Sequence, residues 1–160
     1  MRRDQEFSEY FAQRGPALRR TAYLIVRDWH IAEDVVQQAF TKLYVAWPRV
    51  DVATRDAYAR KAVVNTALSQ VRKRVEPPTG HVPEKVVLPP EESGLDVGRA
   101  LDLLPERQRA IVALRFLDDL PVTEVAHALG IAEGTVKSQT SRALDTLRAH
   151  LPELVAAEEL

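Results

Sequence analysis

The stretch LPVTEVAHALGIAEGTVKSQTSRALDTLRAHL, residues 120–151, constrains the fold of this chain more than any other part. Its apolar residues recur at helical spacing and predict one helix over about 121–129 and a second over about 133–150. Gly130 lies between them and can adopt the left-handed backbone that ends a helix sharply. Because so short a connection forces the two helices to pack on each other, the C-terminal part of the chain is predicted to be helical.

Three residues of this stretch fit the spacing of a DNA-binding helix-turn-helix. Ala126 is small where the helices cross, Gly130 turns the chain, and Val136 packs the second helix onto the first. In that motif the second helix enters the major groove. The alternative is an ordinary pair of packed helices with a solvated outer face. DNA binding is favoured because the outer face carries polar residues, namely Lys137, Ser138, Ser141 and Arg142.

Charge is distributed unevenly along the chain. Residues 1–75 carry 14 Lys and Arg against 8 Asp and Glu, a net charge of +6, whereas residues 101–160 have a net charge of −4. The N-terminal half therefore attracts nucleic acid more strongly. In the acidic half, Ala132 occupies the position where a helix N-cap acceptor is expected, which costs ~0.5–2 kcal/mol. We expect this half to bind DNA weakly on its own.

The N-terminal part predicts three helices, over about 5–27, 31–46 and 56–74. Asp28 is a candidate N-cap for the second helix, and Pro48 ends it. The dipeptide Gly15–Pro16 predicts a kink or break within the first helix.

Two polar faces in this part are candidate binding surfaces. On the second helix the face is polar with little charge and is either solvated or a docking surface; it comprises Asp34, Gln37, Gln38 and Thr41. On the third helix a polar stripe comprises Lys61, Asn65, Ser69 and Arg72. Asn has poor helix propensity, so Asn65 is predicted either to be satisfied in the core or to have a function. Basic residues at the end of this helix, Arg72, Lys73 and Arg74, are favoured there by the helix dipole.

A proline-rich segment separates the two helical parts. Five of the ten prolines fall within 76–94, which is acidic and shows no helical period, so it is predicted to be a flexible linker. Helical spacing returns from about residue 95, with a helix after Pro105 and a frayed tail after Pro152. The predicted fold is all-α: two small helical domains, 1–75 and 95–160, the second a four-helix domain containing the helix-turn-helix.

No catalytic or metal-binding motif is present. The chain has no Cys, and its four His residues form no HExxH or HxxxH pattern. We therefore predict that it is not an enzyme, with no catalytic residue, metal or cofactor. The sequence contains no long apolar run and no signal peptide, so we expect a cytoplasmic protein without membrane insertion.

Four motifs, in this order, carry a family resemblance. They are AEDVVQQAF at 32–40, AVVNTAL at 62–68, LPERQRAIVALRF at 104–116 and TEVAHALGIAEGTVKSQTSRALDTLR at 123–148. With them the chain resembles the extracytoplasmic-function (ECF) sigma factors, the minimal sigma subunits of bacterial RNA polymerase. The resemblance implies a protein that binds core polymerase and directs promoter-specific transcription initiation.

The resemblance also implies roles for the polar faces. The first domain would bind the clamp helices of the polymerase β′ subunit through Asp34, Gln37, Gln38 and Thr41. It would open the −10 element, with Asn65 and the loop 49–56 holding a flipped base. The strand phosphates would lie on Lys61, Arg72, Lys73 and Arg74.

The second domain would read the −35 element and contact the polymerase β flap. Its reading residues would be Lys137, Ser138, Ser141 and Arg142, with Glu133 and Gln139 as additions. Family members often have Arg at the position of Lys137, so base specificity differs there. An anti-sigma factor is a common partner in the family. The linker would thread along the polymerase active-site cleft.

Two other functions are consistent with parts of the sequence. A free-standing helix-turn-helix regulator would use its N-terminal domain as a sensor or dimerisation unit. A helical-bundle enzyme is the third reading, although no motif supports it. Asn65 together with the polar face around Gln37 favours the sigma factor, because a sensor domain needs neither.

Overall fold

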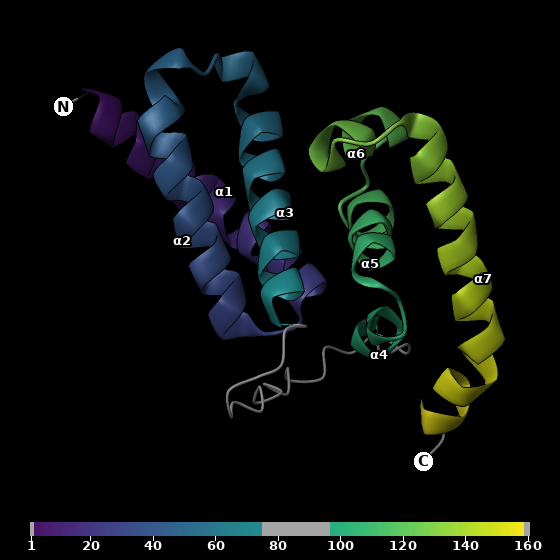
Figure 1. The fold of residues 1–160 in the computed structure, drawn as a ribbon. Helices are drawn as coiled ribbons and strands as arrows, with labels where there is room; N and C mark the ends of the chain where they lie inside the picture. The colour runs from purple at the N-terminus through teal and green to yellow at the C-terminus, as the bar shows by residue number, and fades with distance from the viewer. Residues whose placement is uncertain (1, 75–96, 159–160) are drawn as a thin grey trace.

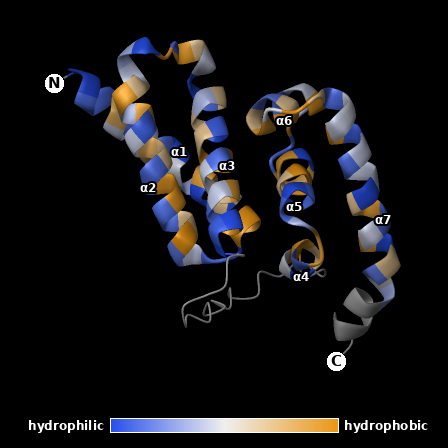
Figure 2. Ribbon diagram, viewed as in Figure 1, coloured by the Kyte–Doolittle hydropathy of each residue, from blue (hydrophilic) through white to orange (hydrophobic). Residues whose placement is uncertain are grey.

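The computed structural model of the chain describes residues 2–74 and 97–158 (Figure 1). All regular secondary structure in these ranges is helical, which confirms the predicted fold class. Apolar and polar residues alternate along the helices, as expected for amphipathic helices around a core (Figure 2). The predicted linker, 76–94, lies outside the described residues.

The N-terminal domain consists of three mutually packed helices. They are α1 (Arg2–Val26), α2 (Trp29–Ala46) and α3 (Arg55–Arg74). Asp28 is confirmed as the N-cap of α2, because its side chain accepts hydrogen bonds from the backbone N–H groups of His30 (2.9 Å) and Ile31 (3.1 Å). Two short 3₁₀ turns, Trp47–Arg49 and Val52–Thr54, form the connection from α2 to α3.

Of the predicted kink or break at Gly15–Pro16, the break is wrong. Helix α1 is continuous through both residues. Proline removes one backbone hydrogen bond, a local cost. Burial offsets it on both sides of the proline: Tyr10 before it and Leu18 after it both pack into the same core. Gly15 is itself buried beside the ring of Phe11.

The C-terminal domain contains the predicted helix-turn-helix. Helices α6 (Val122–Leu129) and α7 (Glu133–Glu158) are joined at Gly130, which has a left-handed backbone with φ of 66°. The N–H of Ile131 donates to the carbonyl oxygen of Ala126 at 3.1 Å, closing the turn. Helix α7 continues through Pro152 to Glu158, beyond the residue after which the sequence predicts a frayed tail.

Two further helices precede this motif. Helix α4 (Val97–Asp102) is short, and α5 (Glu106–Val112) continues into a π-helical turn, Ala113–Leu117. The N–H of Asp118 donates to the carbonyl oxygen of Ala113 at 3.0 Å. This wider turn rotates the last side chains outward. Leu117 is therefore 44% exposed, although its spacing with Ile111 and Leu114 predicts a buried position.

The two domains pack against each other. Helix α3 contacts α6, and α1 contacts α5. Val63 of the first domain and Ile111, Leu114 and Val125 of the second belong to one continuous cluster of buried residues. Helix α7 packs on α4, α5 and α6 and lies at the side of the molecule away from α2 (Figure 1).

Candidate nucleic-acid and polymerase interfaces

The outer face of α7 has the geometry expected of a recognition helix. Val136 and Ala143 are fully buried and hold α7 onto the domain. The residues on the opposite face are exposed: Glu133, Lys137, Ser138, Ser141 and Arg142. Helical spacing places these five on one side of α7. The structure therefore brings together five of the six residues predicted for this site.

Gln139 does not belong to that face. Its side chain is half-buried, and its carbonyl oxygen accepts a hydrogen bond from the amide of Gln108 on α5 at 3.1 Å. Glu133 also has a local partner, because the hydroxyl of Thr123 donates to its carboxylate at 2.7 Å. This bond links the two helices of the motif near the turn, where Ala132 offers no side-chain cap.

The polar stripe on α3 is exposed as predicted, with Lys61, Asn65, Ser69 and Arg72 on one side of the helix. Asn65 is not satisfied in the core: among the described residues nothing makes a hydrogen bond to its amide. Lys61 and Asn65 line a cavity of about 510 Å³ whose other wall includes His127 of α6. The amide of Asn65 is therefore available to a ligand, which favours a functional role.

The three basic side chains at the end of α3 have different partners. Arg74 donates to the carbonyl oxygen of Val26 and to the Asp28 carboxylate, both at 3.4 Å, so it ties the corner between α1 and α2. Arg72 pairs with Glu106 of α5 at 3.4 Å. Lys73 is exposed, with no ion pair to the described residues. Only Lys73 therefore offers an uncommitted charge here.

Polar contacts reinforce the packing between the domains. The Nε of Arg27 donates to the Asp102 carboxylate at 3.0 Å, and Arg109 lies 3.8 Å from the same oxygen. Burial lowers the pKa of Arg109. Arg60 of α3 pairs with Glu124 of α6 at 3.5 Å. Basic groups of the first domain thus meet carboxylates of the second.

One further contact joins the domains through Asp118. The hydroxyl of Thr21 on α1 donates to the Asp118 carboxylate at 2.7 Å. Burial raises the pKa of Asp118 above its ordinary value, although this hydrogen bond and three nearby arginines act in the opposite direction. The interface therefore contains a carboxyl group that is sensitive to pH.

The connection between α2 and α3 borders a second, open recess of about 320 Å³. It is lined by Ala46, Arg49, Val50, Thr54 and Tyr58. Tyr58 also lines the larger cavity with Asn65, so its ring lies between the two. The loop 49–56, for which the resemblance implies a base pocket, therefore does border a recess next to α3.

Helix α2 presents the predicted outer face. Asp34, Gln37, Gln38 and Thr41 are all exposed. Val45 continues this face one turn beyond Thr41 and is 66% exposed. Sequence reasoning missed Val45, although its spacing of four residues from Thr41 could have revealed it.

Neither metal chemistry nor a membrane span is visible in the described part of the chain. Across residues 2–74 and 97–158, no three His, Cys, Asp or Glu side chains gather closely enough to hold a metal ion. Within the same ranges, none of the helices combines the length and apolar character that crossing a membrane requires.

Comparison with known proteins identifies the family. Residues 10–76 match the family model for sigma-70 region 2, and residues 95–147 match sigma-70 region 4. The chain is 37% identical over 152 residues to the RNA polymerase sigma-E factor of Streptomyces coelicolor, covering 91% of this chain and 86% of that protein. This chain belongs to the ECF sigma factors.

Other relatives agree with this assignment. The sigma factor is 31% identical to the ECF RNA polymerase sigma factor SigM of Mycobacterium tuberculosis, covering 93% of this chain and 76% of that one. Its structure resembles the sigma factor RpoE solved in complex with the anti-sigma factor NepR from Bartonella quintana. That match has a TM-score of 0.78 and 26% identity, and it covers 92% of this chain and 98% of that one.

Membership of this family establishes the general function. Sigma factors bind RNA polymerase and direct promoter-specific transcription in the cytoplasm. They are transcription initiation factors rather than enzymes. The reading as a free-standing regulator with a sensor domain is not favoured, because residues 10–76 match region 2.

Proposed function

We propose that the two domains of this sigma factor contact different promoter elements while both are bound to core RNA polymerase. Residues 1–75 bind core polymerase and open the −10 element, and residues 95–160 read the −35 element. Residues 76–94 connect them. The observation that carries the proposal is the exposed, unpaired Asn65 on α3, beside Lys61 and next to the recess of the α2–α3 loop.

At the −10 element, one base leaves the stack and is held by the N-terminal domain. A base extruded from a duplex exposes its hydrogen-bonding edge, which an amide can read, and extrusion costs a few kcal/mol. Asn65 supplies such an amide, and Tyr58 offers an aromatic ring, 40% exposed, on which a base can stack. Lys61 and Lys73 hold strand phosphates, together with Arg72 once it is released from Glu106.

At the −35 element, α7 lies in the major groove. Arg142 can donate two hydrogen bonds to one guanine, whereas Lys137 acts as a point charge toward guanine or phosphate. Ser138 and Ser141 contact either bases or phosphates, and Glu133 can accept from cytosine. Gln139 stays at the edge of this surface because Gln108 holds it.

The outer face of α2 binds the β′ clamp helices, and the C-terminal domain binds the β flap. Asp34, Gln37, Gln38 and Thr41 make the polar contacts, with Val45 as an apolar addition. We also propose an anti-sigma factor as a regulatory partner, since the RpoE structure that this chain resembles contains one. The protein then acts in the cytoplasm on the nucleoid.

In vitro transcription with purified core polymerase tests this proposal. Asn65→Ala should reduce opening of the −10 element at least tenfold, measured by permanganate reactivity of unpaired thymines, while binding to core polymerase stays unchanged. Ser69→Ala is the matched control, one turn along the same exposed stripe, and should open promoters normally. Normal opening by Asn65→Ala removes Asn65 from the −10 site, and failure of the native chain to bind core removes the entire proposal.

A further inference from the structure

The α2–α3 connection is closed by an arginine stacked on a tryptophan. Trp47 is the first residue of the connection and is buried, and Arg55 begins α3. The Arg55 guanidinium carbon lies 3.9 Å from the centroid of a Trp47 ring. A guanidinium over an indole is a favourable cation–π contact. The two ends of the connection are therefore joined directly.

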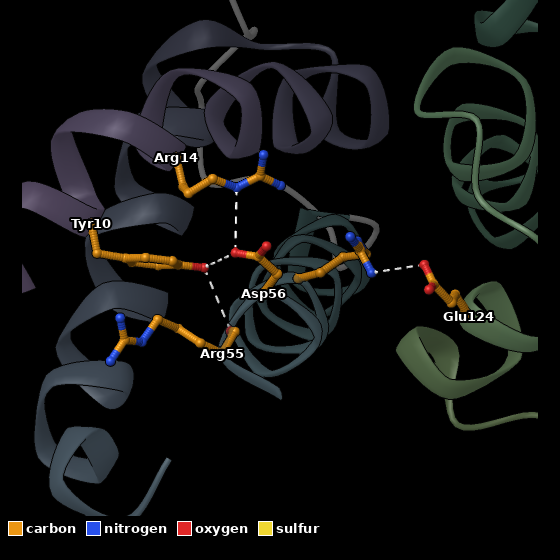
Figure 3. A network of polar contacts seen from close by, with 6 residues as sticks. Tyr10, Arg14, Arg55, Asp56 and Glu124 are labelled. Atoms are coloured by element: carbon orange, nitrogen blue, oxygen red, sulfur yellow. Dashed lines mark hydrogen bonds and ion pairs between the residues drawn. The ribbon is translucent and has the colours of Figure 1, made fainter. Parts of the chain in front are cut away.

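A hydrogen bond fixes the same end of α3 to helix α1. The Tyr10 hydroxyl donates to the Asp56 carboxylate at 2.8 Å and lies 3.5 Å from the carbonyl oxygen of Arg55 (Figure 3). Arg14 of α1 pairs with the same carboxylate at 3.5 Å. Burial, followed by the hydrogen bond to Asp56, raises the pKa of Tyr10, so its hydroxyl stays protonated as the donor.

Aromatic rings of α1 pack against Trp47 beneath this contact. The rings of Phe7 and Tyr10 lie 5.3 Å and 5.4 Å from that of Trp47. Within the connection, the N–H of Val50 donates to the carbonyl oxygen of Trp47 at 3.3 Å, and Thr54 bonds back to Asp51. Val50 packs against the core, whereas Val52 is 75% exposed. The attachment of both ends therefore contributes to the shape of the connection.

The recess within the connection depends on that shape, although neither Arg55 nor Tyr10 lines it. We propose that Arg55 and Tyr10 are positioning residues, which hold the connection so that its recess can receive the extruded −10 base. This inference rests on the proposed function of the N-terminal domain. A site whose supporting contacts are fixed in advance avoids ordering the loop when the base arrives.

The test measures coupling between these residues and the captured base. Holoenzyme containing each variant is titrated with a fluorescent single strand carrying the −10 sequence, and with strands in which one nucleotide at a time is abasic. The ratio of the two affinities reports base capture. A variant that merely weakens the domain lowers both affinities and leaves the ratio unchanged.

The informative substitutions are Arg55→Gln, Arg55→Lys and Tyr10→Phe. With the native chain, removing the base at one position of the strand should lower its affinity at least tenfold. Arg55→Gln should reduce that loss to twofold or less, Arg55→Lys should restore most of it by retaining a cation over Trp47, and Tyr10→Phe should give an intermediate ratio. Arg19→Gln is the matched control, because Arg19 stacks on Trp29 at 5.0 Å in the same domain, away from the recess.

Three results distinguish the possibilities. If Arg55→Gln and Tyr10→Phe both lose as much affinity for the abasic strand as the native chain does, the positioning role is wrong. If Arg55→Gln does not fold, judged by thermal unfolding and core binding, Tyr10→Phe decides alone, since it keeps the buried ring. If the native chain shows no penalty at any position, base capture itself is wrong, and the proposed function of the N-terminal domain fails with it.

Discussion

The two proposed DNA surfaces of this sigma factor differ in what they face. The stripe on α3 is turned toward the C-terminal domain: Arg72 pairs with Glu106, and Lys61 and Asn65 share a cavity with His127. The outer face of α7 is turned away from the N-terminal domain, and Arg142 makes no ion pair with the described residues. In this arrangement a −35 duplex can reach its surface, whereas a −10 strand running along α3 meets α5 and α6.

Charge contributes to this difference. The N-terminal part is basic and the C-terminal part acidic, and their opposite charges meet at the interface as Arg27–Asp102, Arg60–Glu124 and Arg72–Glu106. Glu106 occupies Arg72, which the proposed function assigns to strand phosphates. We therefore expect the packing of the two domains on each other, here called domain closure, to compete with −10 binding. On the proposed assignment, the acidic C-terminal domain leaves its own reading helix exposed and covers the DNA surface of the N-terminal domain.

Among the substitutions considered, Asp102→Asn is expected to weaken the packing of the two domains on each other the most. It leaves Arg27 and Arg109 facing each other without the shared carboxylate. Because Asp102 is partly exposed, we expect closure to weaken by about 1–2 kcal/mol. The chain has no native cysteine, so dyes can be attached at Gln13→Cys on one domain and Ala149→Cys on the other. Separation of the two domains then lowers the energy transfer between the dyes. Asp145→Asn, which breaks an ion pair within α7, is the control and should change nothing.

A smaller effect is expected at the pair between α3 and α6. Arg60→Glu or Glu124→Arg alone should weaken closure by about 0.5–1 kcal/mol, because the Glu124 side chain is half exposed. The double variant exchanges the charges and should recover most of the loss in the same energy-transfer assay. Additive losses in the double variant would show that the two side chains do not interact in solution.

A pH dependence of closure is expected from Asp118. Burial raises its pKa in the closed form, so protonation of Asp118 favours closure. This stabilisation is fully present below the ordinary carboxyl pKa of 3.8 and is lost as the pH rises through the raised value. Asp118→Asn keeps an acceptor for Thr21 but does not titrate. It should therefore flatten energy transfer measured against pH, and an unchanged profile would assign the dependence to other groups.

No effect on closure is expected from Arg142→Ala, since Arg142 lies on the free face of α7. The substitution should instead weaken binding to −35 duplex by about 1–3 kcal/mol if the side chain contacts a base. Gel-shift titration of holoenzyme with matched and altered −35 sequences measures this. Equal weakening on all sequences would make Arg142 a phosphate contact.

Much of the fold and of the site follows from local sequence signals. Helical spacing, the Asp28 cap and the Gly130 turn predict the elements, and periodicity predicts the polar faces of α2, α3 and α7. The sequence leaves open whether Asn65 is satisfied in the core, and the structure places it on the exposed face. These features depend on neighbours within a few residues. The sequence predicts them well because no distant contact opposes them.

The remaining features depend on contacts between distant residues. Core burial on both sides of Pro16 accompanies the continuity of α1 through the proline, and a π-helical turn exposes Leu117. Gln139 is drawn to Gln108 on another helix, and the packing of α3 on α6 joins parts on either side of the linker. Periodicity within one helix carries no information about such partners.

The most direct test of the difference between the two surfaces is to lock the domains together. A chain carrying Arg60→Cys and Glu124→Cys is joined by a short bismaleimide, and its binding to −10 single strand and −35 duplex is compared with that of the same chain left unjoined. We predict that joining weakens binding to the −10 strand at least tenfold and changes binding to the −35 duplex less than twofold. Undiminished binding of the −10 strand by the joined chain would contradict the competition between domain closure and −10 recognition.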